Sequence, residues 1–175
     1  MNREPGSRDL SLISRVRRNH ALEHATMNIL GTRYARLRLV GRSSLWGFYI
    51  YGDVPTEGVI AAAREGLRRL KAGQRRMAIH PNCGSNLAVA GVLAGVGAFV
   101  AAGGLSKRRK RLVYRLARLP LACAAAMLGI AVAQPLGTVV QAHVTTQADV
   151  GALRIVDVTR EKRAGVVVHH VRTGV

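Results

Sequence analysis

The sequence has little cysteine, few aromatic residues and few acids, and each shortage excludes a class of protein. Only two cysteines, Cys83 and Cys123, occur in 175 residues. Because the second lies inside an apolar run, a disulfide-stabilised scaffold is excluded and a reducing compartment is expected. Aromatic residues make up 4% of the chain and apolar residues 49%. Ala, Val, Leu and Ile therefore supply the hydrophobicity, and a disordered or collagen-like chain is excluded.

The scarcity of acids leaves a large positive charge, since nine Asp and Glu stand against 27 Lys and Arg, a net charge of +18. Such an excess is typical of proteins that bind nucleic acid or anionic lipid. Arg supplies 23 of the bases, however, and a GC-rich genome produces the same bias without selection for a partner. The bases are also divided among residues 1–85, 105–119 and 141–175 and form no single cluster, so nucleic acid is not expected as a partner.

Two long runs carry no charged residue, Leu87 to Leu105 and Leu119 to Val140. Each has about the 20 residues that a helix needs to cross ~30 Å of hydrocarbon. The sequence therefore predicts two transmembrane helices, 86–105 and 119–140. The alternative is a pair of buried core helices, because Gln134 and Pro135 interrupt the second run.

Small residues recur at four-residue spacing in both runs, a pattern that lets helix backbones approach closely. It predicts a helical hairpin closed by a basic loop, 106–118, and allows homo-oligomers formed through the small-residue faces of the transmembrane helices. The residues concerned are Gly91 and Gly95 in the first run, and Ala122, Ala126, Gly129 and Ala133 in the second.

The lipid bilayer is accordingly the predicted partner, and the orientation follows from the N-terminal part of the chain. The positive-inside count is balanced, because seven bases in 107–118 stand against five in 68–76 together with Arg154 and Arg160. Residues 1–85 hold 15 bases and six acids, a net charge of +9, and exporting them without a signal peptide is difficult. We therefore expect a multi-pass protein of the cell inner membrane with both termini in the cytoplasm.

The rest of the chain predicts an α+β fold, a small sheet with two helices on one face. Residues 1–85 form this N-terminal domain, and a C-terminal β segment, 141–175, completes it. After a turn at 41–44, the strand at 46–54 is expected to pair back antiparallel on the one before it. The expected helices are 12–30 and 56–70, and the expected strands are 36–40, 46–54, 77–79, 154–158 and 166–171.

The sharpest local pattern is His20-Ala-Leu-Glu23-His24, an H-x-x-E-H motif within the first predicted helix. Residues four apart lie on the same face of a helix, so the two imidazoles can bind one metal ion. Glu23 lies next to the second histidine and can accept a proton from metal-bound water, as in the inverted zinc-site pattern. The motif predicts a zinc site with Glu23 as catalytic base. The alternative is three ordinary polar positions of an Arg-rich helix.

A catalytic zinc has three protein ligands and one open position, so a third ligand is needed. His80 is the preferred candidate and Cys83 the next, because His80-Pro-Asn-Cys83-Gly turns the chain just before the first apolar run. The same stretch is also typical of a turn and helix cap. His169 and His170 point to opposite faces of their predicted strand, so at most one can join the site. The other candidates are Glu57, Glu65 and His143.

Two resemblances rest on these residues. The stretch His20 to Thr32, HALEHATMNILGT, resembles the zinc helix of the pitrilysin/insulinase metallopeptidases, and Gly52 to Glu57, GDVPTE, is similar to their passage from strand to helix. This resemblance implies His20 and His24 as ligands and Glu23 as base. Across the whole chain, the stretches RNHALEHAT, GDVPTE and HPNCGSNL resemble an uncharacterised family of small bacterial two-helix membrane proteins, and that resemblance implies no activity.

Three functions compete at this point. The first is a membrane-anchored zinc-dependent hydrolase, peptidase-like, which needs the metal and Glu23. The second is a non-enzymatic membrane protein whose histidines hold a structural metal or a cofactor such as a tetrapyrrole, which needs the histidines but not Glu23. The third is a basic adaptor at the membrane surface, which needs only the arginines.

Overall fold

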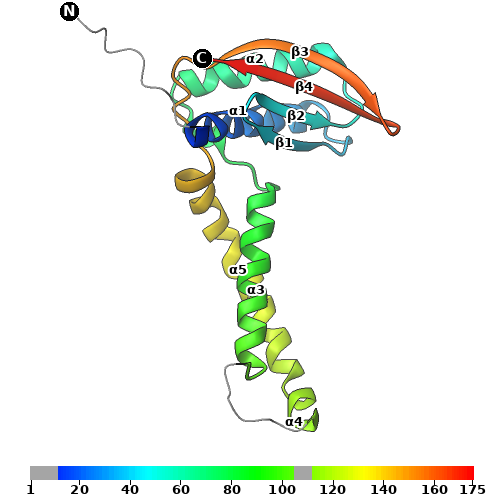
Figure 1. Cartoon of the computed structure of the whole chain (residues 1–175), viewed down its shortest axis with the longest axis vertical. Helices are drawn as coiled ribbons and strands as arrows, with labels where there is room; N and C mark the ends of the chain where they lie inside the picture. Colours follow the sequence, from blue (N-terminus) through cyan, green and yellow to red (C-terminus); the bar gives the residue numbers. More distant parts are fainter. Residues whose placement is uncertain (1–11, 105–111) are drawn as a thin grey trace, which may run out of the picture. The chain divides into compact units, whose positions relative to one another are not determined.

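The computed structural model describes residues 12–104 and 112–175 (Figure 1). The chain divides into two compact units. One contains residues up to His80 together with 142–175, and the other contains residues 81–141. The first unit is a helix-and-sheet layer and the second is a pair of apolar helices, as the segregation of charged and apolar residues in the sequence indicates.

The sheet of the first unit has four antiparallel strands in the order β1-β2-β4-β3. Their bounds are β1 Val40–Ser44, β2 Gly47–Tyr51, β3 Arg154–Arg163 and β4 Val166–Gly174. The antiparallel return of the second strand and the C-terminal hairpin are confirmed. Because β4 pairs with β2, the end of the chain supplies half of the sheet.

The position of the first strand was predicted wrongly. Residues 36–40 were expected to be extended and 41–44 to turn, but β1 occupies Val40–Ser44. Ser44 pairs with Gly47, so the turn has only two residues, Leu45 and Trp46. Gly47 has a φ of 139°, and a Cβ there would collide with the Val171 carbonyl. A glycine is therefore required directly after this turn.

Helices α1 (Leu12–Arg33) and α2 (Thr56–Lys71) pack together and against one face of the sheet, as predicted. Phe48 and Ile50 alternate with exposed-face residues along β2 and lie fully buried under the helices. They form one core with side chains from both helices and β4. Its other fully buried members include Leu22, Leu30, Val59 and Val171.

The strand predicted at 77–79 is a short 3₁₀ helix instead, η1 Arg75–Ala78. The physical reason is where its carbonyl groups find partners. Asn28 of α1 donates to the Met77 and Ile79 carbonyls at 3.2 and 2.9 Å, and the Ala78 carbonyl bonds the His24 ring at 2.7 Å. These carbonyls therefore bond side chains of α1, and not a neighbouring strand.

The second unit contains α3 (Gly84–Ala101), α4 (Leu112–Ala117) and α5 (Leu119–Val140), and α5 continues into a π-helical turn, η2 (Gln141–Thr145). By length and composition, α3 and α5 with η2 are each apolar and long enough to cross a membrane. The predicted basic loop 106–118 lies partly outside the described residues, because 105–111 are not described.

Close packing between α3 and α5 uses different small residues from those predicted for the first helix. A Cβ on Gly129 would lie 2.7 Å from the Leu93 backbone, and one on Gly97 would lie 3.1 Å from the Ala125 carbonyl. Gly91 and Gly95 have nothing within 4 Å. They stand two residues from the contacting positions 93 and 97, which puts them about 200° round the helix. The G-x-x-x-G pattern of α3 therefore faces away from α5.

Candidate metal centre

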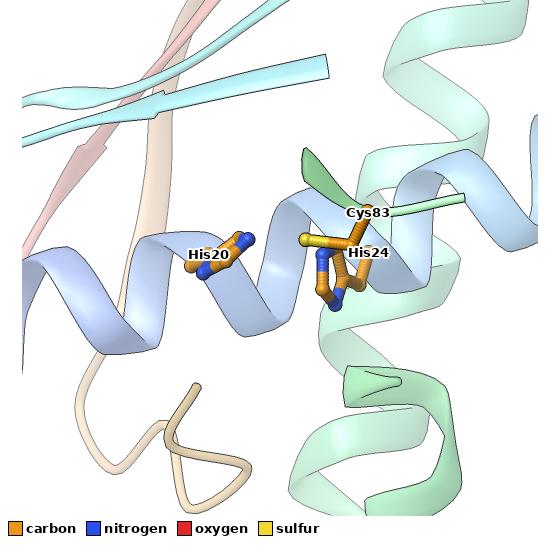
Figure 2. Close-up of side chains that lie close together, drawn as sticks. All are labelled: His20, His24 and Cys83. Atoms are coloured by element: carbon orange, nitrogen blue, oxygen red, sulfur yellow. The ribbon is translucent and has the colours of Figure 1, made fainter. Parts of the chain in front are cut away.

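His20 and His24 lie on successive turns of α1, as the spacing predicts (Figure 2). Their ring centroids are 4.3 Å apart, and each ring offers a nitrogen within 4.8 Å of the other. Two nitrogens bound to one zinc lie about 2.0–2.1 Å from the ion. A small adjustment of the two side chains therefore places both rings on a single ion.

His24 is 1% exposed, and its two ring nitrogens differ in their environment. Nδ1 lies 2.7 Å from the Ala78 carbonyl, which can only accept, so Nδ1 carries the proton and donates. In the neutral ring Nε2 then presents a lone pair, and this atom is buried without a hydrogen-bond partner in the part of the chain that the structure describes. Burying such an atom costs about 1–3 kcal/mol unless something binds it.

His20 adopts the same tautomer by the same means. Its Nδ1 lies 2.9 Å from the carbonyl of Thr145, in the π-helical turn that follows α5. Nδ1 therefore donates, and the lone pair of this ring is also on Nε2. A backbone carbonyl that holds Nδ1–H is the partner that fixes the tautomer and orientation of a metal-binding histidine in many proteins.

His80 belongs to the same group of rings, with its centroid 5.8 Å from that of His24. Its Nδ1 lies 2.8 Å from Oδ1 of Asn28. The Asn28 amide is oriented by its two donations to the Met77 and Ile79 carbonyls, so Oδ1 must accept and His80 must donate. All three histidines of this cluster thus present Nε2 as the acceptor atom.

Asn28 was missed in the sequence, although the signal was present. It follows His24 by four residues, as His24 follows His20, so all three lie along one stripe of α1. The spacing places the Asn28 amide on the helix face of the two histidines, and there its Oδ1 accepts from Nδ1 of His80.

Glu23 is 6% exposed and points toward β1. The Ser43 hydroxyl donates a hydrogen bond to its carboxylate, and a Cβ on Gly41 would collide with the same carboxylate. Ser43 and Gly41 face inward on β1, so the edge strand and α1 enclose this side chain. The role of Glu23 as a catalytic base stays a prediction.

Cys83, which is labelled in Figure 2, belongs to the second unit and is the N-cap residue of α3. Its sulfur accepts from the Ser85 backbone N–H at 3.5 Å. Cys83 follows His80 by three residues, so the chain alone limits their Cα separation to about 11 Å. Among the described residues, Cys83 is not part of a disulfide.

The other candidate ligands are engaged elsewhere or exposed. Arg68 and Arg69 hydrogen bond to Glu65 at 2.8 and 2.7 Å and lower the pKa of its carboxyl to about 2. Glu57 and His143 have exposed side chains. Within the described residues, none of these three side chains forms a group of potential metal ligands with the histidines.

His169 and His170 point to opposite faces of β4, as predicted, because His169 pairs with Ile50 and His170 with Tyr49. His169 is fully buried, its Nε2 lies 3.2 Å from the Thr56 hydroxyl, and burial lowers its pKa. In the described part of the chain, neither belongs to the group of His20, His24 and His80.

These features define an α+β protein with two helices able to span a membrane and a cluster of histidines on its first helix. The chain belongs to a family described as a domain of unknown function, DUF6391, whose model matches residues 15–158. It is 34% identical over 151 residues to an uncharacterised protein of the cyanobacterium Picosynechococcus sp., which covers 81% of this chain and 69% of the relative. No solved structure matches the chain.

Proposed function

We propose that the protein is a multi-pass membrane protein that binds a zinc ion through His20, His24 and His80. The observation that carries this proposal is the buried Nε2 of His24, which has no hydrogen-bond partner in the described residues while Nδ1 is held by a carbonyl. Two more imidazoles with the same tautomer lie beside it. Three neutral imidazoles suit zinc, which binds His nitrogen in tetrahedral sites.

Zinc supplies Lewis acidity or structural rigidity, depending on how the remaining coordination position is used. Within this chain, Asn28 and the Ala78 and Thr145 carbonyls orient the three rings. Cys83 is the candidate for a further ligand, because its position just after His80 keeps the thiol near that ring. A thiolate in this place would close the site and favour a structural role.

A paired test distinguishes the two candidates for the third ligand. His80→Ala is expected to weaken zinc affinity by more than the roughly 10–100-fold that removing an orienting partner costs. Cys83→Ser is expected to weaken it less, with competition against a chelator as the measurement for both. Asn28→Ala, which removes only the orienting amide, provides the reference within that range. A larger loss of zinc affinity for Cys83→Ser than for His80→Ala would make Cys83, and not His80, the third ligand.

Metal-dependent hydrolysis, peptidase-like, is the second candidate function. It is favoured by the H-x-x-E-H spacing, which the structure places on one continuous helix with Glu23 between the two histidines in sequence. The contact with Ser43 holds the Glu23 carboxylate against β1, however, so Glu23 would act as a base only after leaving that contact. The substitution Glu23→Gln separates this function from metal binding alone.

The proposed location is the cell inner membrane, with α3 and α5 crossing it and both termini in the cytoplasm. The support is the length and composition of the two helices. A reporter cysteine at Ser106, in a chain without Cys83 and Cys123, is expected to react with an impermeant thiol reagent in intact cells.

A control reporter at the exposed Val166 of β4 is expected to react only after lysis. Reaction at Val166 in intact cells with protection at Ser106 would reverse the orientation. Reaction at both or at neither would contradict a two-span topology.

A further inference from the structure

A pocket of about 360 Å³ lies on the first unit, at the end of the sheet where the β1–β2 turn meets β3 and β4. Its size falls in the range of small-molecule sites, roughly 300–1,000 Å³. It shares no residue with the histidine cluster, so it is independent of the proposed zinc site. The residues that line it are Trp46, Val156, His170, Arg172 and Thr173.

Two irregularities of the sheet build this pocket. The two-residue turn projects Trp46, which is 59% exposed, and its carbonyl is held by the Thr173 N–H at 3.0 Å. On the other side, the register shifts between Ile155 and Asp157, so Val156 is an extra residue in β3 and is 56% exposed. A bulge of this kind re-aims a side chain. Both apolar side chains are thus presented at the surface by special backbone geometry.

The polar groups of the pocket come from β4. Arg172 is half exposed and lies 3.5 Å from Asp157, a separation that leaves most of its donors for another acceptor. His170 stacks on Tyr49 with ring centroids 4.2 Å apart and an angle of 13°, and its Nε2 is buried without a hydrogen-bond partner among the described residues. Burial and Arg172 lower the pKa of His170, so the ring is neutral at pH 7.

We propose that this pocket binds a nucleotide, with the base against Trp46 and Val156 and a phosphate on Arg172. An exposed indole is a stacking surface for a base, and a guanidinium matches phosphate oxygens in pairs. Arg15 lies 4.6 Å from the centre of the Trp46 ring, which adds a second cation at this edge. A second copy of the chain is a poorer occupant, because the net charge of +18 opposes self-association here.

The nucleotide can be free or part of a single strand, since both offer the same base and phosphate. Trp46 is the only tryptophan in the sequence, so its fluorescence reports occupancy of the pocket directly. The full chain in detergent is titrated with AMP, with UMP, with single-stranded oligothymidylate and with inorganic phosphate. Saturable quenching by the mononucleotides is expected. If only the oligonucleotide quenches the fluorescence, the ligand is a nucleotide within a single strand, bound through the same base and phosphate groups.

Arg172→Gln is expected to weaken binding by on the order of ten- to a hundred-fold. Arg163→Gln is the matched control, because it removes the same charge from the same hairpin at an exposed position paired with Glu161. It should change affinity by less than about two-fold. Val156→Glu, which puts a carboxylate at the exposed bulge, provides a second disrupting variant if Arg172→Gln does not fold. Equal effects of the two Arg variants, quenching by inorganic phosphate alone, or no saturable quenching would overturn the proposal.

Discussion

Replacing His20 and His24 together by Ala is expected to lower the zinc content of the purified protein from about one ion per chain to almost none. Each ring supplies one Nε2, and a site that loses two of three imidazoles retains no tetrahedral set. Elemental analysis of detergent-purified protein after extensive dialysis measures the result. Either single substitution should also remove stoichiometric zinc.

His143→Ala is the matched control for this experiment, because it removes one of the six histidines at an exposed position outside the cluster. It should retain the full zinc content. Stoichiometric zinc that survives the double substitution would place the metal elsewhere. Loss of zinc in His143→Ala alone would make that residue a ligand, contrary to the proposed set.

The double substitution His20→Ala/His24→Ala should also show how much of the stability of the fold depends on the metal. If the wild-type chain binds zinc as proposed, zinc at a thousand times its dissociation constant would add about 4 kcal/mol to the free energy of unfolding. Removing that metal would also leave the buried Nε2 of His24 without a partner among the described residues. A chelator should therefore lower the thermal midpoint of the wild-type protein and leave that of the His20→Ala/His24→Ala protein unchanged.

The second large effect is expected for Glu23→Gln, on the rate of peptide hydrolysis. If the protein hydrolyses peptides, Glu23 must take the proton of the attacking water, and the substitution should lower the rate by about 10²- to 10⁴-fold. The amide oxygen of Gln can still accept from the Ser43 hydroxyl, so fold and zinc content should be preserved. Cleavage of a quenched fluorescent peptide library, measured beside zinc content, gives both readouts.

Ser43→Ala is the control that isolates the hydrogen bond to Glu23. It removes the contact that holds the carboxylate against β1 and leaves the carboxylate itself. A hydrolase should keep measurable activity in Ser43→Ala and lose it in Glu23→Gln. Zinc-dependent cleavage that is unchanged by Glu23→Gln would rule out Glu23 as the base.

Much of the first unit could be predicted from sequence because its signals are local. The period of apolar residues identified α1 and α2, and strand-forming residues from Trp46 onward identified β2. The H-x-x-E-H spacing also brought His20 and His24 together, because i and i+4 side chains meet on any regular helix. None of these inferences required knowledge of a partner distant in the sequence.

The errors concern features set by distant residues. The segment 77–79 is not a strand because Asn28 and His24 bind its carbonyls, and β1 was displaced because the turn closes at Leu45 and Trp46. The tautomers of the histidines were equally hidden, since they depend on carbonyls such as Thr145, far along the chain. Spacing identifies which residues can be ligands, whereas their orientation is a property of the fold.

X-ray absorption at the zinc edge of the wild-type protein tests the proposed centre most directly. We expect a first shell of imidazole nitrogens at about 2.0–2.1 Å, with the outer-shell scattering of at least two histidine rings. One sulfur at about 2.3 Å would add Cys83 to the set. A protein that binds no zinc, or zinc with a shell of oxygen and no histidine signature, would contradict the assignment of His20, His24 and His80 as ligands.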